Sequence, residues 1–384
     1  MPSFWCRPMI GQEKDIRLQG ATMKFAMIGA AMLGAAILIL GATVVAWNRT
    51  LDNDATASSG TVDDSTVTGT SATSTVKGMS FAGATPPNAK ALAKAHTPYP
   101  AALPPLTPGN VVKVHMVLKD VTIEIAPGIK YAAWGFEGGA PGPVVHARQG
   151  QTVEMTLTNG GAIPHSIDFH AARIAPNKAF IDVMPGKSFT FSFKASDPGV
   201  FMYHCGTKPV LMHIANGMYG AIVVDPATPL PKADKQYVLV ASEWYLTSDG
   251  LDKPAQFDLN KARAVMPDWT TFNGYAGQYV AHPLTADPGD TVRFYVVDAG
   301  PSLTTAFHVV GTVLNTAYVN GDMNPDHALK GVQTVDVPAG GGGVFDVKIN
   351  EEGLYPVVSH AFASVDMGQV GILKVGNPPG TTSH

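Results

Sequence analysis

Two stretches of this sequence, 142–161 and 278–300, follow one pattern, and this repeat narrows the possible folds most. In each stretch, a strand-like run leads through a turn and a glycine to a second strand-like run. A second pair, 184–204 and 337–360, follows in the same order, and both of its members end in histidine. Alternating apolar runs separated by glycine and proline are typical of β-strands. The sequence therefore predicts an all-β body of two similar β-sandwiches, with two unrelated all-β domains as the alternative.

The domain organisation follows from the repeat and from the composition between its parts. We expect the first sandwich over 111–226 and the second over 227–376, joined at the proline-rich stretch DPATPLPKADKQ (225–236). Residues 81–110 are rich in alanine and proline, and they predict an extended arm that lies on the folded body. Residues 377–384 remain as a tail. A chain of 384 residues is long enough for two such domains and their cores.

The amino-terminal region predicts that the rest of the chain is exported. Residues 25–47 carry no charge and are long enough to cross a bilayer. Basic residues precede this segment and acidic residues follow it. The positive-inside rule therefore predicts a cytoplasmic N-terminus and a transmembrane anchor over 1–47, a flexible tether over 48–80, and a periplasmic or otherwise extracytoplasmic body. A signal peptide that starts at Met23 and is cleaved after Ala46 is the alternative.

The stretch FMYHCGTKPVLMHIANGMYG, residues 201–220, holds an unusual combination of side chains for a cysteine-poor chain. Cys205 is followed by His213 and Met218 in the spacing C-x7-H-x4-M. Thiolate, imidazole and a weak thioether are the ligands of a blue-copper electron-transfer site, which usually takes a second imidazole from an earlier strand. His165 is the candidate for that position. The alternative is a buried free cysteine among core methionines.

The neighbour of this cysteine, His204, predicts a second metal site. Adjacent side chains of a β-strand point to opposite faces, so His204 and Cys205 cannot easily bind one ion, but they can bind two ions joined by one peptide bond. His170 lies an odd number of residues after His165, and it therefore shares the opposite face, together with Asp168. Two imidazoles are too few for a stable catalytic site. Further ligands are available in the second half, where the candidates are His308 and His360, although packed core histidines are the alternative for both.

Taken together, these motifs resemble the copper-containing nitrite reductases over roughly residues 100–376. The resemblance rests on HSIDFHAA, on YHC followed by MHIANGMYG, on FNG at 272–274, on FHVVG, and on SHAFASVDMGQVGILKVG at 359–376. It implies two tandem Greek-key cupredoxin-like sandwiches and about two copper ions per chain. It also implies one-electron reduction of nitrite to nitric oxide, with electrons passed from a type 1 to a type 2 copper.

The resemblance also assigns roles to single residues. The implied type 1 copper ligands are His165, Cys205, His213 and Met218. The implied type 2 copper ligands are His170, His204 and His360. The implied acid–base pair near the type 2 copper is Asp168 and His308. Val310 stands where the family commonly has isoleucine, at a position that shapes the substrate pocket.

The expected partners are nitrite, a small electron donor such as a cytochrome c or a cupredoxin, and two further copies of the chain. In the family, the type 2 copper lies between the subunits of a homotrimer. The net charge of −4 and the scattered basic residues do not predict a nucleic-acid partner. Two other functions stay open: an electron carrier with the type 1 copper alone, and a two-domain multicopper oxidase. A trinuclear cluster needs His-x-His motifs, and the sequence contains none.

Overall fold

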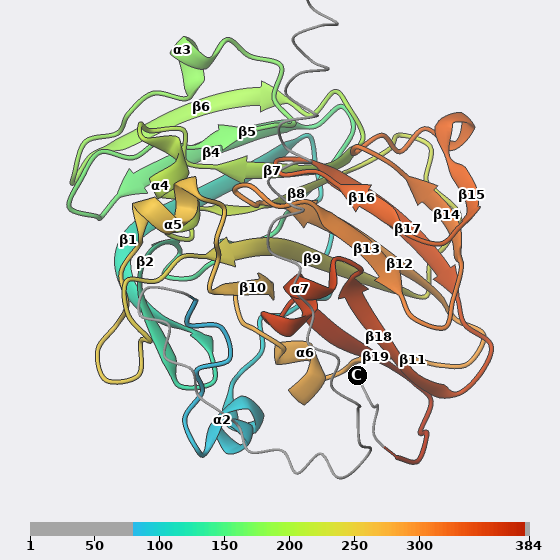
Figure 1. The fold of residues 1–384 in the computed structure, drawn as a ribbon. Helices are drawn as coiled ribbons and strands as arrows, with labels where there is room; N and C mark the ends of the chain where they lie inside the picture. Colours follow the sequence, from blue (N-terminus) through green and yellow to red (C-terminus); the bar gives the residue numbers. More distant parts are fainter. Residues whose placement is uncertain (1–79, 381–384) are drawn as a thin grey trace, which may run out of the picture. The chain divides into compact units, whose positions relative to one another are not determined.

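The computed structural model describes residues 80–380, which all fall in one compact unit of the chain. The expected anchor or signal segment at 25–47, nearly all of the expected tether, and the last four residues lie outside the described residues. Within 80–380, no helix combines the length and the apolar character that a bilayer crossing requires. The described part is built mainly from β-strands with a few short helices, as predicted (Figure 1).

The first half of the body forms two four-stranded sheets. One sheet has the order β2-β1-β4-β6. Its strands are β1 (Val111–Ala126), β2 (Ile129–Phe136), β4 (Thr152–Asn159) and β6 (Ser188–Lys194). The other sheet has the order β3-β8-β7-β5. Its strands are β3 (Val145–Arg148), β5 (Asp168–Phe169), β7 (Gly199–His204) and β8 (Tyr219–Asp225).

The second half forms two larger sheets. The six-stranded sheet has the order β10-β9-β12-β17-β14-β15. Its strands are β9 (Lys235–Trp244), β10 (Trp269–Phe272), β12 (Thr291–Asp298), β14 (Leu314–Tyr318), β15 (Leu329–Val332) and β17 (Gly342–Lys348). The five-stranded sheet has the order β11-β19-β18-β13-β16. Its strands are β11 (Leu284–Ala286), β13 (Thr305–Val309), β16 (Val335–Val337), β18 (Gly353–Ser359) and β19 (Val370–Val375).

The two halves share one strand order, as the sequence repeat predicts. In the first half, β1 pairs parallel with β4, and β4 pairs antiparallel with β6; β9, β12 and β17 pair in the same way in the second half. The facing sheets also match. The series β3, β8, β7, β5 and the series β11, β19, β18, β13 each begin with a parallel pair and continue with two antiparallel pairs.

The three largest apolar cores of the described residues pack the four sheets together. One core fills the space between the sheets of the first half, and another fills the space between those of the second half. The third core lies between the halves, where Met202 and Tyr219 of the first half pack with Tyr295 and Val297 of the second. The sheet that contains β7 and β8 is covered on both faces. Consecutive residues of β8 are therefore buried, instead of alternating between buried and exposed.

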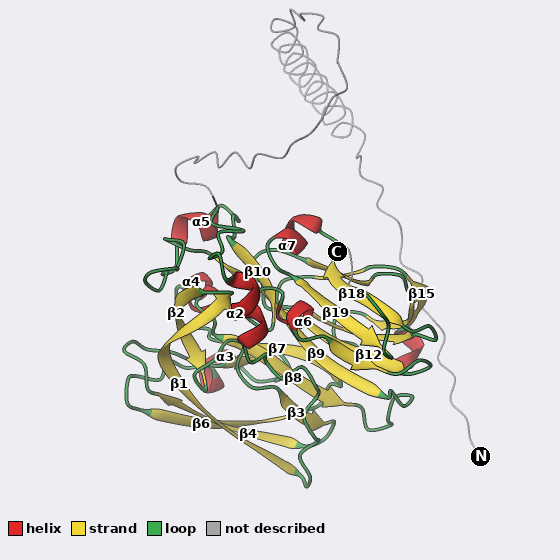
Figure 2. Cartoon of the chain, turned by 90° about the horizontal axis from the view of Figure 1, so that it is seen from below, coloured by secondary structure: helices red, strands yellow, loops and turns green. Residues whose placement is uncertain are grey.

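The helices are short and lie outside the sheets (Figure 2). They are α2 (Ala89–Ala95), α3 (Pro176–Ala179), α4 (Val210–Ala215), α5 (Leu259–Arg263), α6 (Gln278–Ala281), the 3-10 helix η1 (Pro325–His327) and α7 (Phe362–Asp366). The helix α2 interrupts the extended conformation expected over residues 81–110. Its sequence, AKALAKA, consists only of strong helix formers, and this local preference explains the difference.

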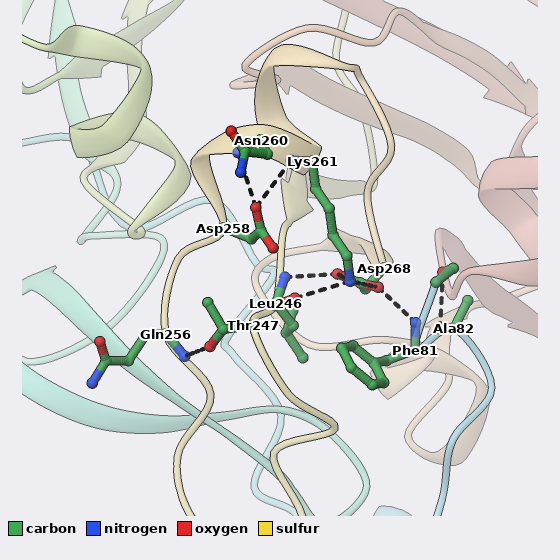
Figure 3. Close-up of polar contacts among 10 residues, drawn as sticks. Phe81, Ala82, Leu246, Thr247, Gln256, Asp258, Asn260, Lys261 and Asp268 are labelled. Atoms are coloured by element: carbon green, nitrogen blue, oxygen red, sulfur yellow. Dashed lines mark hydrogen bonds and ion pairs between the residues drawn. The ribbon is translucent and has the colours of Figure 1, made fainter. Parts of the chain in front are cut away.

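The start of the arm is fixed to the body by a group of residues that we call the amino-terminal clamp: Phe81, Leu246, Lys261 and Asp268 (Figure 3). The carboxylate of Asp268 is fully buried and accepts the backbone N–H of Phe81 at 2.6 Å and that of Leu246 at 2.6 Å. The ammonium of Lys261 donates to the same carboxylate at 2.9 Å and lies 4.2 Å from the centre of the Phe81 ring. The clamp therefore joins the beginning of the described chain to α5.

Candidate metal centres

The first candidate centre brings together His165, Cys205 and His213. His165 lies in the loop between β4 and β5, Cys205 directly follows β7, and His213 lies on α4. Their ligand atoms all lie within 4.8 Å of one another, and all three residues are buried. Cys205 Sγ is 3.2 Å from His213 Nδ1 and 3.9 Å from His165 Nδ1, and the two Nδ1 atoms are 3.1 Å apart.

Backbone hydrogen bonds hold His165 and Cys205 in place. The backbone of His165 exchanges two hydrogen bonds with Val183, at 3.2 and 2.7 Å. The backbone N–H of Cys205 donates to the carbonyl of Met218 at 3.1 Å, so the predicted thioether ligand starts from a backbone position beside the thiol. Met218 is fully buried in the core of the first half, together with Cys205.

The electrostatics of this centre suit a metal ion. Burial lowers the pKa of His165 and that of His213 to about 4, so both imidazoles are neutral near pH 7 and can offer a lone pair. The indole of Trp134 packs against both rings, with centroid separations of 5.2 and 4.9 Å. A soft sulfur and two neutral imidazole nitrogens in an apolar pocket are donors that fit copper.

The second candidate centre contains Asp168, His170 and His204. Asp168 and His204 are directly paired across β5 and β7, and His170 follows β5. The ligand atoms of the three residues lie within 4.8 Å of one another. His170 is exposed, whereas Asp168 and His204 are half-buried. The expected shared face of these residues is therefore present.

The hydrogen bonds of the two histidines define which nitrogens are free. His170 Nδ1 contacts the carbonyl of Gly340 at 3.0 Å, and His204 Nδ1 contacts the carbonyl of Cys205 at 2.9 Å. A carbonyl only accepts, so each Nδ1 carries a hydrogen. The two Nε2 atoms are 3.1 Å apart, and burial lowers the pKa of His204. With a hydrogen on each Nδ1, a neutral ring has its lone pair on Nε2. The Nε2 lone pairs of His170 and His204 would then point toward each other, and a shared cation stabilises this arrangement.

The two centres meet at one peptide bond. The structure places the thiol of Cys205 in the first centre and the imidazole of His204 in the second. The strand β7 ends at His204, so Cys205 lies just beyond the strand that the sequence analysis extended through it. The hydrogen bond from His204 to the Cys205 carbonyl adds a second connection between the centres.

The second half contributes a separate histidine pair. His308 on β13 and His360, which follows β18, have ring centroids 5.3 Å apart. His308 Nδ1 donates to the carbonyl of Gln333 at 2.6 Å, and His360 is exposed. Within the described part of one chain, neither histidine joins the group of Asp168, His170 and His204. Val310 is half-buried and begins the turn after β13.

Sequence reasoning missed two residues of the first centre. Trp134 packs on both histidines from β2, far away in the sequence, and no spacing signals this contact. Ser166 donates its backbone N–H to Cys205 Sγ at 3.4 Å. The position of Ser166 directly after His165 in HSIDFH was a usable signal, because the residue beside a ligand is well placed to contact the neighbouring ligand.

The fold and the two centres define a copper protein, and a family model described as multicopper oxidase matches residues 118–229. A copper-containing nitrite reductase of Neisseria gonorrhoeae is 39% identical over 270 residues, which cover 69% of this chain and 68% of the relative. The structure of a copper nitrite reductase from Nitrosomonas europaea is 34% identical, with a TM-score of 0.64, and the match covers 70% of this chain and 94% of that one. A multicopper oxidase structure is 27% identical, with a TM-score of 0.60 and coverage of 69% and 89%. The chain belongs to the copper-containing nitrite reductases.

Proposed function

We propose that this protein reduces nitrite to nitric oxide with one electron and two protons, NO2− + e− + 2H+ → NO + H2O. The observation that carries this function is the pair of centres on either side of the Cys205–His204 peptide bond, one buried and one open to solvent. A site that accepts electrons and a site that binds a small anion are thereby joined by the shortest covalent path that the backbone offers.

Each centre has its own donor set. We assign His165, Cys205, His213 and Met218 to the type 1 copper. His170 and His204 hold the type 2 copper together with His360 of a neighbouring subunit. When bound, copper supplies one-electron chemistry at the first centre and a Lewis acid for an oxyanion at the second. The ratio is then about two copper ions per chain.

The proton chemistry falls to Asp168 and His308. Asp168 is half-buried directly beside His204, where its carboxylate can hold a proton and pass it to a nitrite oxygen. His308 keeps a hydrogen on Nδ1 for the Gln333 carbonyl, so its Nε2 is the atom that can take up or release a proton. Val310 shapes the pocket beside it.

A homotrimer would complete the open centre. The His308–His360 pair and the His170–His204 pair are separate within one chain, and His170 and His360 are both exposed. Phe362 packs against the His360 ring at a centroid separation of 4.7 Å and is 57% exposed. An exposed aromatic side chain beside a metal-binding histidine suits a subunit interface.

The remaining expectations concern organisation and location. The halves are assigned as Greek-key cupredoxin-like sandwiches over 111–226 and 227–376. The segment 25–47 would anchor or export the body to the periplasm or another extracytoplasmic space. The electron donor would be a small cytochrome c or cupredoxin that approaches the buried centre.

The test is a nitrite-dependent assay of nitric oxide with the full-length chain, with copper counted in the same preparation. We expect nitric oxide and about two copper ions per chain. The matched control is His204→Ala, which should keep the thiolate–copper absorption and lose the activity. One copper per chain without nitric oxide production would favour the electron carrier instead.

A further inference from the structure

A chain of polar side chains leads from the Cys205 sulfur to the protein surface. Ser166 is fully buried, with its backbone N–H 3.4 Å and its hydroxyl 3.9 Å from Sγ. The hydroxyl of Thr207 donates to Ser166 Oγ at 3.2 Å and to Asp182 Oδ1 at 2.7 Å. Asp182 is exposed, in the loop between α3 and β6. The mechanism described above uses none of these three side chains.

The hydrogen-bond partners of the Ser166 hydroxyl determine whether it donates to the Cys205 sulfur. Its oxygen accepts the backbone N–H of Gly206 at 3.0 Å and has a second lone pair for the Thr207 hydroxyl. When Thr207 gives its hydrogen to Asp182, Thr207 Oγ1 can accept the Ser166 hydrogen. When Thr207 donates to Ser166 instead, the acceptor that remains for the Ser166 hydrogen within residues 80–380 is the sulfur of Cys205. The long distance of 3.9 Å makes this a weak hydrogen bond, whereas the backbone N–H of Ser166 provides the main one.

Asp182 and Ser166 compete for the single hydroxyl hydrogen of Thr207. Thr207 has one hydroxyl hydrogen and two acceptors, and the carboxylate is both the closer and the charged one, so it takes the larger share. If the carboxylate were absent, Thr207 would donate fully to Ser166. The Ser166 hydroxyl would then be more strongly polarised and a better donor to the sulfur, because hydrogen bonds in a chain reinforce one another.

The charge of Asp182 also reaches the metal ligands directly. Burial is the main influence on the pKa of His165 and of His213 and lowers both, while Asp182 acts in the opposite direction on each. A negative charge near the centre favours the more positive, oxidised form of a bound metal ion. Stronger hydrogen bonding to the sulfur would favour the reduced form. Both effects of Asp182 therefore have the same sign.

We propose that Asp182 is a positioning residue for the copper-binding thiolate. Acting through Thr207 and Ser166, it limits hydrogen bonding to Cys205 Sγ and keeps the reduction potential of this copper low. The inference rests on the proposed type 1 site and adds a residue that tunes it. A low potential at this centre favours passage of the electron onward to the centre of His204.

The test measures the reduction potential of the copper-loaded protein from its thiolate–copper absorption. We expect Asp182→Ala to raise the equilibrium constant for one-electron reduction roughly three- to tenfold, where tenfold corresponds to about 59 mV. Asp182→Asn, which has the same shape, should give a smaller rise, and Asp182→Glu should restore the original value. Asp252→Asn is the matched control, because Asp252 is an exposed carboxylate in another loop.

A second variant tests the path through Thr207. In a Thr207→Val background, which keeps the shape and removes the hydroxyl, the effect of Asp182→Ala should fall to less than half. An unchanged potential in Asp182→Ala and Asp182→Asn with intact absorption would overturn the proposal, and so would an equal effect in the valine background. If the unaltered protein lacks thiolate–copper absorption when loaded with copper, the type 1 assignment itself is wrong and this inference falls with it.

Discussion

At the scale of single residues, the open centre depends on side chains whose protons are fixed by the backbone. His170 and His204 each give a hydrogen to a carbonyl, which leaves their Nε2 atoms facing each other. Asp168 lies opposite His204 on the neighbouring strand. The proposed metal ligands and the proposed proton donor therefore lie on two adjacent strands or directly after one of them, and a change of Asp168 need not disturb the two histidines.

Asp168→Asn should separate proton delivery from metal binding. The amide keeps the size of the carboxylate but cannot exchange a proton, and positioned acid–base groups commonly contribute at least about 10²-fold to a rate. We expect both copper ions to remain and turnover with nitrite to fall about 10²-fold. Steady-state rates and copper counts on the same sample check this. Unchanged turnover would rule out the proton role of Asp168.

The buried histidines of the first centre predict how the copper-free protein responds to acid. The pKa of His165 and that of His213 are about 4 in the folded chain, below the ordinary value of 6.5. Between these values the unfolded chain binds more protons, so the free energy of unfolding decreases as the pH falls from 6.5 toward 4. Urea midpoints of the copper-free protein should be lower at about pH 5 than at about pH 7. The His165→Gln, His213→Gln double variant should show a smaller decrease, and an equal decrease would contradict this origin.

At the scale of secondary-structure elements, α4 and α5 connect the amino-terminal clamp with the first centre. Ala262 of α5 and Ala215 of α4 share a small core with Tyr245, and α4 also carries His213. The clamp fixes the other side of α5 through Lys261 and Asp268. The beginning of the arm is thus attached to elements that support His213, a proposed metal ligand.

Asp268→Asn should destabilise the body. Lys261 and Asp268 form an ion pair whose side chains are 12% and 0% exposed, and removing one partner leaves a buried charge without its counterion. Such changes commonly cost about 3 kcal/mol of unfolding free energy. Urea unfolding measures the loss. The double variant Lys261→Met, Asp268→Asn removes both charges and should lose less than the sum of the single variants. Strict additivity would show that the pair contributes no stabilising interaction.

At the scale of the whole molecule, the proposed trimer makes one catalytic centre from two chains. Coexpression of His204→Ala and His360→Ala chains tests this assignment. Each variant alone should be inactive, but random assembly places an intact His204 beside an intact His360 of the neighbour in about a quarter of the interfaces. Nitrite turnover of the mixed protein should therefore return to roughly a quarter of the original rate. If the mixture is as inactive as its parents, the two histidines do not combine across subunits.

The sequence predicted the repeated features of the molecule better than its unique ones. Strand periodicity and turns are local, so strands such as β4 and the common strand order of the halves could be anticipated, and the spacing around Cys205 indicated the first centre. Three features could not be anticipated from the sequence: the packing of Trp134 on the two histidines, the helix α2, and the acceptor role of Asp268. Trp134 and Asp268 depend on contacts between distant segments, and α2 depends on a local preference that the surrounding prolines concealed.

The sheet of β3, β8, β7 and β5, which is covered on both faces, makes the first half dependent on the second. Val200, Met202, Tyr219 and Val223 are all almost inaccessible to solvent, and the second half provides their cover. Without the second half, the first sandwich would expose this apolar surface to water, and copies of it would associate through that surface. Covalent attachment of the second half keeps this surface covered in every copy of the chain, and we expect residues 111–226 expressed alone to associate or aggregate.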